Sequence, residues 1–322
     1  MDAGAPDGES LDGSGTAVLT ELFARICPLL FTVAYEILGS AVDAEDVVQE
    51  SYLRWREVDL REVEHHRAYL VQVVTRLALN QLRSTRRRRE DYVGSWLPEP
   101  IGTAPDAADD AVLAESVSIA MLLVLETLSP HERVVFVLGD VFGHSHKEIA
   151  EIVGKSDTAV RQIAHRARRH VHARRPRYEP DPESSRAIVV QFLLAARNGN
   201  VAQLVNLMAP GIVEITDGGG KVTAARRPVV GAERVAQYVI GLAHKSMAGF
   251  GVDLTTCNTL PAVLFTDKGK LDSVLVFDID EGRIRALYAV RNPDKLGHTA
   301  ITTRLARSVT PGMDPTQMEE SS

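Results

Sequence analysis

Cysteine and aromatic residues are scarce in this chain of 322 residues, which has two cysteines and 5% aromatic residues. Cys27 and Cys257 lie far apart and belong to no CxxC or Cys/His pattern, which argues against a disulfide framework and a zinc site. No apolar run approaches the ~20 residues that a membrane helix needs. Residues 1–15 are acidic and Gly-rich, unlike a signal peptide. We therefore expect a cytoplasmic protein without membrane partner, metal or cofactor, and a disordered tail over residues 1–16.

The formal net charge of −7 is unevenly distributed along the chain. Residues 36–64 hold nine acidic residues and three arginines, whereas residues 65–90 hold seven arginines and one acidic residue. Residues 97–132 hold seven acidic residues and neither lysine nor arginine, and residues 156–177 hold seven arginines and one acidic residue. This alternation favours a protein that contacts polyanions in two places and something basic between them.

The segment from Thr16 to about Arg89 has the hydrophobic periodicity of helices. The first helix is expected to end at Gly39, a residue type common just after helices. The stretch DAEDVVQESYLRW places apolar side chains on one stripe and acidic side chains opposite. A third helix, HHRAYLVQVVTRLALNQLRSTRRRR, aligns basic side chains on one face and buries the other, which carries Leu70, Val73, Val74 and Leu77.

Two linkers flank a predicted helix-turn-helix. GSWLPEPIGTAPDAADDA and RPRYEPDPES interrupt the helical pattern with proline and glycine. Between them, KEIAEIVGKSDTAVRQIAHRARRHV predicts a helix-turn-helix with Gly154 at the turn. Ser156 is the expected N-cap of the second helix, whose buried stripe is Val160, Ala164, Ala167 and Val171.

The last third of the chain mixes helices and strands. SSRAIVVQFLLAARNGN and RRPVVGAERVAQYVIGLAHK predict helices, and VAQLVNLMAPGIVEITDGGGKV predicts a short helix, a strand and a Gly-rich turn. VDLTTCNTLPAVLFTD, LDSVLVFDID and RIRALYAVRNP each predict one antiparallel strand, with Lys-Gly and Glu-Gly turns between them. This order predicts an α+β domain, followed by a loose tail from Gly297.

Taken in order, these stretches resemble the extracytoplasmic-function (ECF) sigma factors of bacterial RNA polymerase. DAEDVVQESYLRW resembles the family's polymerase-binding helix, RAYLVQVVTRLALNQLRS resembles its minus-ten helix, and the helix-turn-helix resembles the domain that reads the minus-thirty-five element. The last domain resembles the cone-shaped SnoaL-like fold, of the cystatin and NTF2-like class. WLPEP, DGGGK and NPDKL resemble the subgroup in which that domain is fused to the sigma factor. The resemblance implies a factor that binds core polymerase and starts transcription.

The resemblance implies a multidomain chain, with two all-α DNA-binding domains followed by an α+β domain. The expected parts are a disordered tail (1–16), the sigma region 2 domain (17–91), a linker with WLPEP (92–111), the sigma region 4 helix-turn-helix domain (112–175), a second linker (176–184), the SnoaL-like domain (185–297) and a flexible tail (298–322).

The helix after Gly154 is the candidate reader of the minus-thirty-five element. A helix fits the major groove, where residues at its N-terminal end reach base edges and later arginines neutralise phosphates. The alternative is an ordinary solvated basic helix, which the glycine turn and the capped start make the weaker interpretation. The candidate residues are Ser156, Thr158, Arg161, Gln162, His165, Arg166, Arg168 and Arg169.

The third helix is the candidate for the minus-ten element, where unstacked bases and a strand backbone must be held. The resemblance implies that the loop over about residues 59–67 holds a flipped base, with His65, His66 and Arg67 as candidates. A solvated helix end is the alternative for the arginine run 86–89. The aligned face of the helix carries Arg76, Asn80, Arg83 and Arg87.

Two acidic segments are candidates for polymerase contacts. The resemblance implies that the DAEDVVQE helix binds the β′ clamp, that the acidic linker follows the basic RNA-exit path, and that the β flap is a further contact. A plain soluble face, and a linker pinned to its own domain, are the alternatives. The clamp candidates are Asp43, Glu45, Asp46, Gln49 and Glu50, and the linker candidates are Asp106, Asp109 and Asp110.

A lone exposed tryptophan is costly, so we expect Trp96 of the linker to pack against polymerase or the third domain. The resemblance implies that the third domain replaces a separate anti-sigma factor and regulates the two DNA-binding domains in cis. The candidate residues are Trp96, Leu97, Pro98, Glu99, Pro100, Asp217, Gly218, Gly219, Gly220, Lys221, Asn292, Pro293, Asp294 and Lys295.

Some SnoaL-like proteins are enzymes that use aspartate and histidine. Here the available side chains have no spacing that demands catalysis, so we expect no enzyme, and a small-molecule ligand of the domain stays open. Two alternatives are a helix-turn-helix regulator that needs no polymerase, and an enzyme with a DNA-binding appendage, which requires a polar pocket with a perturbed acid or base. The available side chains are Asp217, His244, Asp267 and Asp278.

Overall fold

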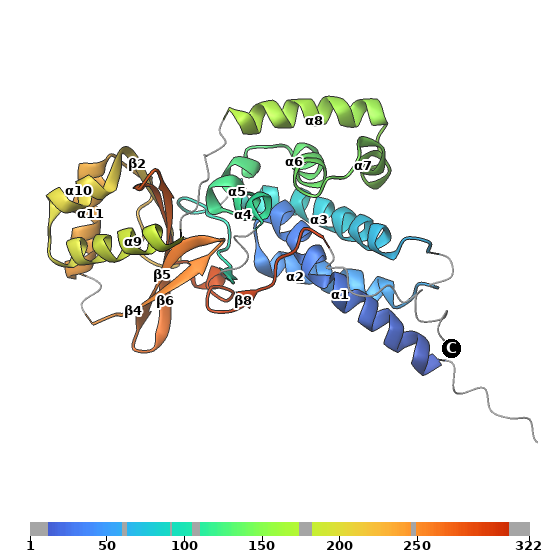
Figure 1. Ribbon diagram of the computed structural model, residues 1–322, viewed down its shortest axis with the longest axis horizontal. Coiled ribbons are helices and arrows are strands. Elements are labelled where there is room, and N and C mark those ends of the chain that lie inside the picture. Colours follow the sequence, from blue (N-terminus) through green and yellow to red (C-terminus); the bar gives the residue numbers. More distant parts are fainter. Residues whose placement is uncertain are drawn as a thin grey trace, which may run out of the picture.

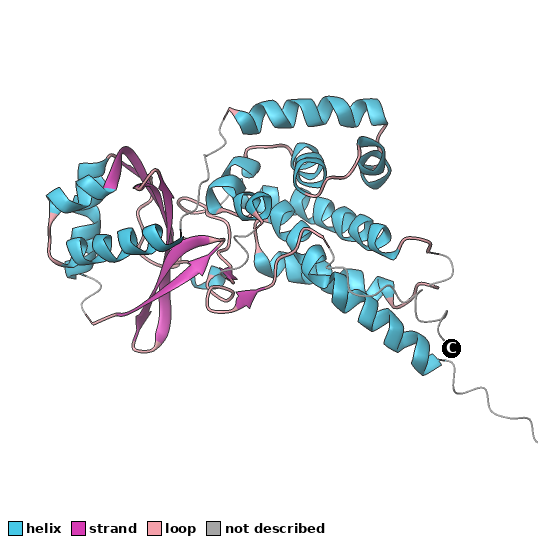
Figure 2. Ribbon diagram, viewed as in Figure 1, coloured by secondary structure: helices cyan, strands magenta, loops and turns pink. Residues whose placement is uncertain are grey.

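A computed structural model describes most of the chain, as three packed parts (Figure 1). Helices gather on one side of the molecule, and the strands gather on the other beside further helices (Figure 2). The described residues are 12–59, 63–90, 92–104, 110–173, 182–245 and 249–308.

The first part is a bundle of α1 (Asp12–Leu38), α2 (Ala41–Trp55) and α3 (His66–Glu90). Helix α1 begins at Asp12, so the prediction of a disordered tail through residue 16 is wrong for residues 12–16. Residues 1–11 are not among the described residues. Gly39 ends α1 as expected, with a φ of +68°. The Trp55 indole is fully buried and donates to the Leu19 carbonyl at 2.9 Å, which ties α2 to α1.

Helix α1 corrects one expectation, because residues 17–38 are long and apolar enough to cross a membrane by length and composition alone. A core helix of a soluble protein passes the same test, and half of this stretch is buried inside the molecule. Its apolar residues belong to the core shared with α2 and α3, which accounts for the composition without a membrane.

The second part contains the helix-turn-helix. Its last two helices are α7 (His146–Val153) and α8 (Asp157–His172), preceded by α4 (Ala111–Ser116), α5 (Ile119–Glu126), α6 (Pro130–Phe136) and the π-helical turn η3 (Val137–Val141). Gly154 has a φ of +66° at the turn, and the Ser156 hydroxyl accepts from the Ala159 amide, as predicted. The predicted stripe of α8 is buried. The local sequence signals for this motif are therefore confirmed.

The third part is an α+β domain. Its elements are α9 (Pro182–Arg197), α10 (Val201–Leu207), β2 (Met208–Asp217), β3 (Val229–Val230), α11 (Ala232–Lys245), β4 (Gly251–Cys257), β5 (Leu260–Asp267), β6 (Lys270–Asp280), β7 (Arg283–Val290) and the short 3-10 helix η4 (Pro293–Lys295). The stretch VDLTTCNTLPAVLFTD forms two strands instead of the predicted one. Asn258 and Thr259 make the turn between them, with φ values of +53° and +63°.

The sheet includes two strands from outside this domain. Its order is β3-β2-β7-β6-β5-β4-β1-β8, where β1 (Gly102–Thr103) comes from the first linker and β8 (Thr302–Thr303) from the C-terminal segment. Strand β1 pairs antiparallel with β4 and parallel with β8. The expectation of a flexible tail from residue 298 is therefore wrong for residues 298–308, and residues 309–322 lie outside the description.

Both faces of the sheet are covered. On one face, Phe192 of α9 packs edge-on against Phe277 of β6 with ring centroids 5.3 Å apart, in a core that α11 also enters. On the other face, Val274 and Val276 of β6 share a core with Leu97 of the linker and Ile119 of α5. Alternate residues along β6 thus contribute to the core of the third domain and to a second core shared with the first linker and α5.

Candidate functional site

The α8 candidates lie along one solvent-facing surface. Gln162, His165 and Arg169 are exposed, and the Ser156 hydroxyl serves as the N-cap. Arg161 pairs with Asp157 at 2.6 Å on the same helix, and two further pairs join α8 to its own domain: Arg166–Glu132 at 3.4 Å and Arg168–Asp140 at 2.8 Å. Partly exposed pairs of this kind are weak, so these arginines can exchange carboxylates for phosphates.

Two of the α3 candidates contact the helix-turn-helix domain. Arg76 donates from Nε to the Ile152 carbonyl at 2.9 Å and from Nη2 to the Glu151 carbonyl at 3.0 Å, at the C-terminal end of α7. A cation at that end is favoured by the helix dipole. Arg83 Nη2 lies 3.0 Å from His131 Nε2 of α6. The surface predicted to hold the minus-ten element therefore faces the helix-turn-helix domain in part.

The remaining minus-ten candidates are spread around α3. Asn80, His65 and Arg67 are exposed. The His66 ring packs edge-on against Trp55 at 5.6 Å, and its Nε2 is buried without a hydrogen-bond partner among the described residues. The side chains of residues 86–89, Arg87 included, lie outside the description, as do residues 60–62 of the predicted base-holding loop.

The clamp candidates on α2 form the expected polar face. Asp46, Gln49 and Glu50 are exposed, and Glu50 pairs with Arg54 at 3.0 Å. Asp43 accepts from Gln81 of α3 at 2.7 Å. Glu45 Oε1 lies 3.1 Å from His298 Nε2, so the C-terminal segment touches this face. Among the linker acids, Asp106 and Asp109 lie outside the described residues.

Asp217, at the end of β2, holds the first linker against the third domain by hydrogen bonds. Its side chain is fully buried. One carboxylate oxygen accepts from the Tyr92 hydroxyl at 2.6 Å and from the Gly219 amide at 3.0 Å. The other accepts from the Leu97 amide at 2.9 Å and from Lys295 Nζ at 2.7 Å. Four donors from three separate stretches of sequence therefore meet at one carboxylate.

Lys295 and Asn292 complete this site. Lys295 Nζ also donates to the Leu97 carbonyl at 2.6 Å and lies 4.4 Å from the centre of the Trp96 ring. The Asn292 amide donates to the Tyr92 hydroxyl at 2.9 Å. Trp96 therefore packs against the third domain, one of the two partners expected for it. We call this set the latch, defined as Tyr92, Trp96, Leu97, Asp217, Asn292 and Lys295.

The glycines of DGGGK allow this turn to approach Asn292 and the first linker closely. A Cβ on Gly219 would lie 2.3 Å from the Asn292 amide nitrogen, and one on Gly220 would lie 3.0 Å from the Val93 side chain. Both residues also have positive φ. The run is thus explained by contact with NPDKL and the linker. Lys221 pairs with Asp294 at the surface.

Glu99 of WLPEP joins the linker to α2. Its Oε2 accepts from the backbone amides of Ala41 and Val42, at 2.8 and 3.2 Å, and from the Ser40 hydroxyl at 3.0 Å. A carboxylate at a helix N-terminus is favoured by unpaired amides and by the helix dipole. The other oxygen lies 3.0 Å from His298 Nδ1. Burial lowers the pKa of His298, but hydrogen bonds to Glu99 and Glu45 outweigh it and raise the pKa overall.

The turn between β4 and β5 lies where all three parts meet, and sequence reasoning missed it. Asn258 is fully buried, and its amide nitrogen donates to the Tyr35 hydroxyl of α1 and to the Val117 carbonyl, both at 2.7 Å. Its side-chain oxygen accepts from the Ile101 amide at 3.1 Å. Thr259 donates to the Ala114 carbonyl at 2.8 Å. The available signal was an Asn-Thr pair between two β-rich runs, since asparagine tolerates a left-handed turn.

A polar cluster lies between α1 and the helix-turn-helix domain. Glu36 is fully buried and accepts from the Ser116 hydroxyl at 2.7 Å, while its backbone carbonyl accepts from Arg133 Nε at 2.9 Å. Arg133 also pairs with Glu126. Burial raises the pKa of Glu36 to about 8, with Ser116 and Arg133 offsetting part of the effect.

The C-terminal segment forms a further connection. The Ala306 amide donates to the Thr32 hydroxyl of α1 at 3.0 Å. Arg307 donates to Asp110 at 2.9 Å and to the Val141 carbonyl at 3.2 Å in the helix-turn-helix domain. Residues 305–307 therefore touch both helical parts.

The side chains considered for catalysis do not converge. Asp217 belongs to the latch, His244 lies 3.3 Å from the Arg197 carbonyl, Asp267 is exposed, and Asp278 pairs with Arg285 at 3.4 Å. The described residues contain no group of three or more His, Cys, Asp or Glu that could hold a metal ion. The domain does contain a cavity, and Glu214 lines it. Burial raises the pKa of Glu214 to about 8, so the cavity is not purely apolar and does not by itself remove the enzyme alternative.

Family models match both helical parts. The model described as Sigma-70 region 2 matches residues 22–88, and the model described as Sigma-70, region 4 matches residues 118–171. These ranges contain the α2 and α3 surfaces and the helix-turn-helix, respectively.

Two relatives from Mycobacterium tuberculosis extend the match beyond these domains. The ECF RNA polymerase sigma factor SigJ is 36% identical over 299 residues, covering 86% of this chain and 93% of SigJ. A protein described as the probable ECF RNA polymerase sigma factor SigI is 32% identical over 271 residues, covering 83% and 91%. The crystal structure of SigJ matches with a TM-score of 0.70 at 31% identity, over 89% of this chain and all of that one. The expected fold class is confirmed, and the chain belongs to the ECF sigma factors of RNA polymerase.

Proposed function

We propose that this sigma factor reads the minus-thirty-five element with α8 and the minus-ten element with α3, and that its C-terminal domain regulates both in cis. Family membership makes it a transcription initiation factor that works with RNA polymerase and promoter DNA. The observation that carries the proposal is the pair of contacts from Arg76 and Arg83 to the region 4 domain. They hold the proposed minus-ten surface of α3 against α6 and α7, which pack beside the proposed reader α8.

In the packed arrangement of the structure, which we call closed, α3 is poorly placed to hold a strand. Arg76 directs two of its five donors to carbonyls of α7, so its guanidinium is oriented toward that helix end. We expect full engagement of the minus-ten element by this side chain to break these two hydrogen bonds and to separate α3 from α7. Since the two elements are separate stretches of promoter, the domains are expected to move apart on the polymerase.

Three connections support control by the C-terminal part. The latch holds the linker, the Asn258 turn contacts α1 and the start of region 4, and residues 298–308 run from α2 to Val141. All three favour the closed arrangement through contacts that open domains would lose. A separate anti-sigma factor is then not required, because the inhibitory surface is part of the same chain.

Polymerase docking is expected to use the acidic face of α2. Glu45 of this face contacts His298, which also contacts Glu99. Engagement of Glu45 by the β′ clamp would thus compete with the C-terminal segment. On this proposal the protein acts in the cytoplasm, with no catalytic chemistry of its own.

Run-off transcription with purified core polymerase tests promoter reading. We expect the double variant Arg161→Glu/Arg166→Glu to lower transcript yield at least about tenfold, since each base or phosphate contact contributes ~1–3 kcal/mol. Binding to core polymerase in a pull-down should be unchanged.

The matched control is Arg186→Glu, a charge reversal of an exposed arginine on α9. Undiminished transcription by the α8 variant would refute the proposed reader. A helix-turn-helix regulator that needs no polymerase would instead bind promoter duplex equally well with and without core enzyme.

A further inference from the structure

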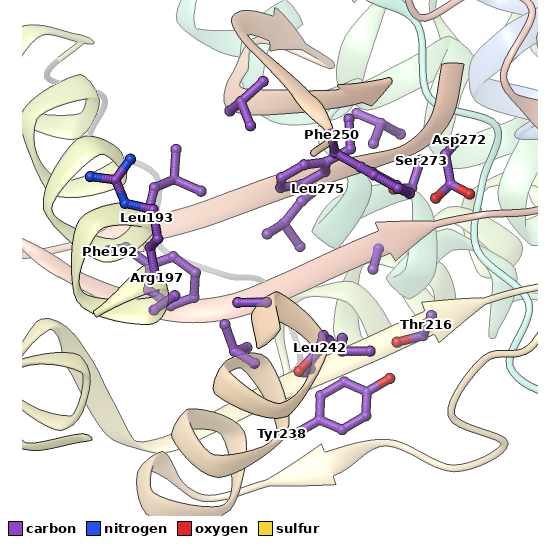
Figure 3. Close-up of a pocket in the computed structure, with 18 of the residues that line it drawn as sticks. Phe192, Leu193, Arg197, Thr216, Tyr238, Leu242, Phe250, Asp272, Ser273 and Leu275 are labelled. Carbon is purple, nitrogen blue, oxygen red and sulfur yellow. The ribbon is translucent and has the colours of Figure 1, made fainter. Parts of the chain in front are cut away.

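A pocket that is partly open to solvent lies in the C-terminal domain, and no latch residue lines it. It has a volume of about 310 Å³ and lies between α9, α11 and the sheet. Most of its lining is apolar, and Figure 3 shows Phe250 and Leu275 across the cavity from Thr216 and Tyr238. A cavity of this size and character is typical of a site for a small molecule.

Two buried polar side chains point to such a ligand. Glu214 and Thr216 alternate along β2, so they share one face of the strand, and both line the cavity. Each is 3% exposed. Glu214 Oε2 and Thr216 Oγ1 make no well-formed hydrogen bond among the described residues, although the Thr216 hydroxyl faces Glu214 and Tyr238 closely enough to lower the pKa of both. A buried polar atom left unpaired is costly, so these two atoms are explained by a ligand that bonds them.

Burial favours the neutral forms of two titratable groups that line the cavity, Glu214 and Tyr238. Burial raises the pKa of Glu214 to about 8, and the neighbouring Thr216 hydroxyl offsets part of this shift. Tyr238 also lines the cavity, and burial raises the pKa of its phenol. A neutral carboxyl, a hydroxyl and a phenol can each donate to a carbonyl oxygen. The other charged lining residues are Asp272 and Arg291, which pair at 3.0 Å, and Arg197, which is exposed.

We infer that this cavity binds a small, uncharged, largely apolar molecule with a carbonyl or hydroxyl oxygen, which Glu214 and Thr216 hold. An apolar body suits the phenylalanine and leucine lining, and a neutral oxygen suits the donors. An anion is disfavoured because no unpaired cation is buried among the described lining residues. Catalysis is disfavoured because the neutral acid of Glu214 has no free base beside it in that lining.

The polar end of the cavity also adjoins the latch. Thr216 precedes Asp217 on β2, and Arg291 precedes Asn292 after β7. The amides of Arg291 and Asn292 both donate to the Asp217 carbonyl, at 2.8 and 3.0 Å. A ligand that draws Thr216 toward the cavity therefore acts on the backbone that holds Asp217. This coupling, unlike the binding itself, rests on the proposed regulation in cis.

Calorimetric titration of the full-length protein with 1-tetralone tests the site. This ketone joins an apolar two-ring body to one carbonyl, tetralin lacks the oxygen, and tetrahydro-1-naphthoate carries a charge. At pH 7 we expect saturable binding of 1-tetralone, with tetralin and the carboxylate each at least about tenfold weaker. Absence of 1-tetralone binding, or equal affinity for all three, overturns the proposal.

Variants of Glu214 separate a binding role from a structural one. Glu214→Gln keeps a neutral donor of the same shape, so affinity should stay within about threefold, whereas Glu214→Leu should weaken it about tenfold. Above pH 8 the wild type should lose affinity as Glu214 ionises, and Glu214→Gln should not. Ala243→Phe fills the cavity from α11 and should abolish binding. Unchanged affinity in both Glu214→Leu and Ala243→Phe would place the ligand elsewhere.

Hydrogen exchange of the linker tests the coupling. Saturation with 1-tetralone should change the exchange rate of the Leu97 amide, which donates to Asp217. Binding without any change in exchange would refute the coupling and leave the binding site intact. Neither result depends on polymerase, so failure here is distinguishable from failure of the proposed function.

Discussion

Asp217 is a buried carboxylate with donors from the linker, from DGGGK and from NPDKL. Its position could be predicted only in part. The three motifs each stood out in the sequence, but nothing local indicates that Tyr92 and Leu97 meet the same side chain. Such a meeting depends on how β2 ends and on where the linker runs, which are properties of the assembled chain.

We predict that Asp217→Asn lowers the free energy of unfolding by about 3–5 kcal/mol, because it leaves Lys295 buried without its carboxylate. Urea denaturation of the full-length protein measures this. The matched control is Asp294→Asn, which breaks the exposed pair with Lys221 and should cost about 0–1 kcal/mol. Equal effects of the two substitutions would show that the latch is not a buried, coupled site.

Asn258 combines two requirements that substitutions can separate. Its side chain makes three interdomain hydrogen bonds, and its backbone has a φ of +53°. Asn258→Gly removes only the side chain, whereas Asn258→Ala also strains the backbone. We expect Asn258→Ala to be less stable than Asn258→Gly by about 1–2 kcal/mol in urea denaturation. Identical stabilities would mean that the turn relaxes, and that its left-handed geometry is not required.

At the scale of elements, the helices were predictable and the two-residue strands β1, β3 and β8 were not. Gly154, Ser156 and the apolar stripe of α8 are local signals, so the helix-turn-helix follows from the sequence. Strands β1 and β8 have no periodicity of their own: β4 offers an edge to β1, and β1 in turn pairs with β8. A linker and a tail were therefore the natural predictions for those segments.

Truncation tests the C-terminal segment as an element. A chain ending at Gly297 loses His298, β8 and Arg307, whereas a chain ending at Ser308 keeps them. The Ala306 amide contacts the turn of α1 around Thr32, and the shorter chain lacks this contact. We therefore expect backbone amides in that turn to exchange at least about tenfold faster in the shorter chain than in the full-length protein. The chain ending at Ser308 should match the full length. Equal protection in both truncations would show that residues 298–308 do not hold α1.

At the scale of the whole molecule, a net charge of −7 conceals two basic surfaces, and the one on α3 partly faces α6 and α7. The sequence indicated two basic blocks, and the family resemblance assigned them to two promoter elements. That Arg76 reaches α7 could not be predicted from local signals, because its two acceptors lie 76 and 75 positions away in the sequence, on a separate motif. Closed packing also buries Glu36 between the two DNA-binding parts.

Burial of Glu36 predicts a pH dependence. Its pKa is raised in the folded protein, from an ordinary value of 4.5 to about 8, so its contribution to stability is fully present below pH 4.5 and is lost as the pH rises to about 8. Between pH 5 and 8 the wild type should therefore lose more unfolding free energy than Glu36→Gln, whose amide does not ionise. Urea denaturation at several pH values measures both, and parallel curves would contradict the burial of a neutral Glu36.

Movement of the two DNA-binding domains is the central claim, and the distance between them measures it directly. Spin labels are attached to Leu53→Cys on α2 and His172→Cys at the end of α8, after Cys27 is replaced by Ser and Cys257 by Ala. Pulsed electron paramagnetic resonance then measures the distance between the two labels. The account predicts one narrow distribution in the free protein and a longer distance once core polymerase and promoter DNA are added. An unchanged distance in a complex that makes transcript would contradict it.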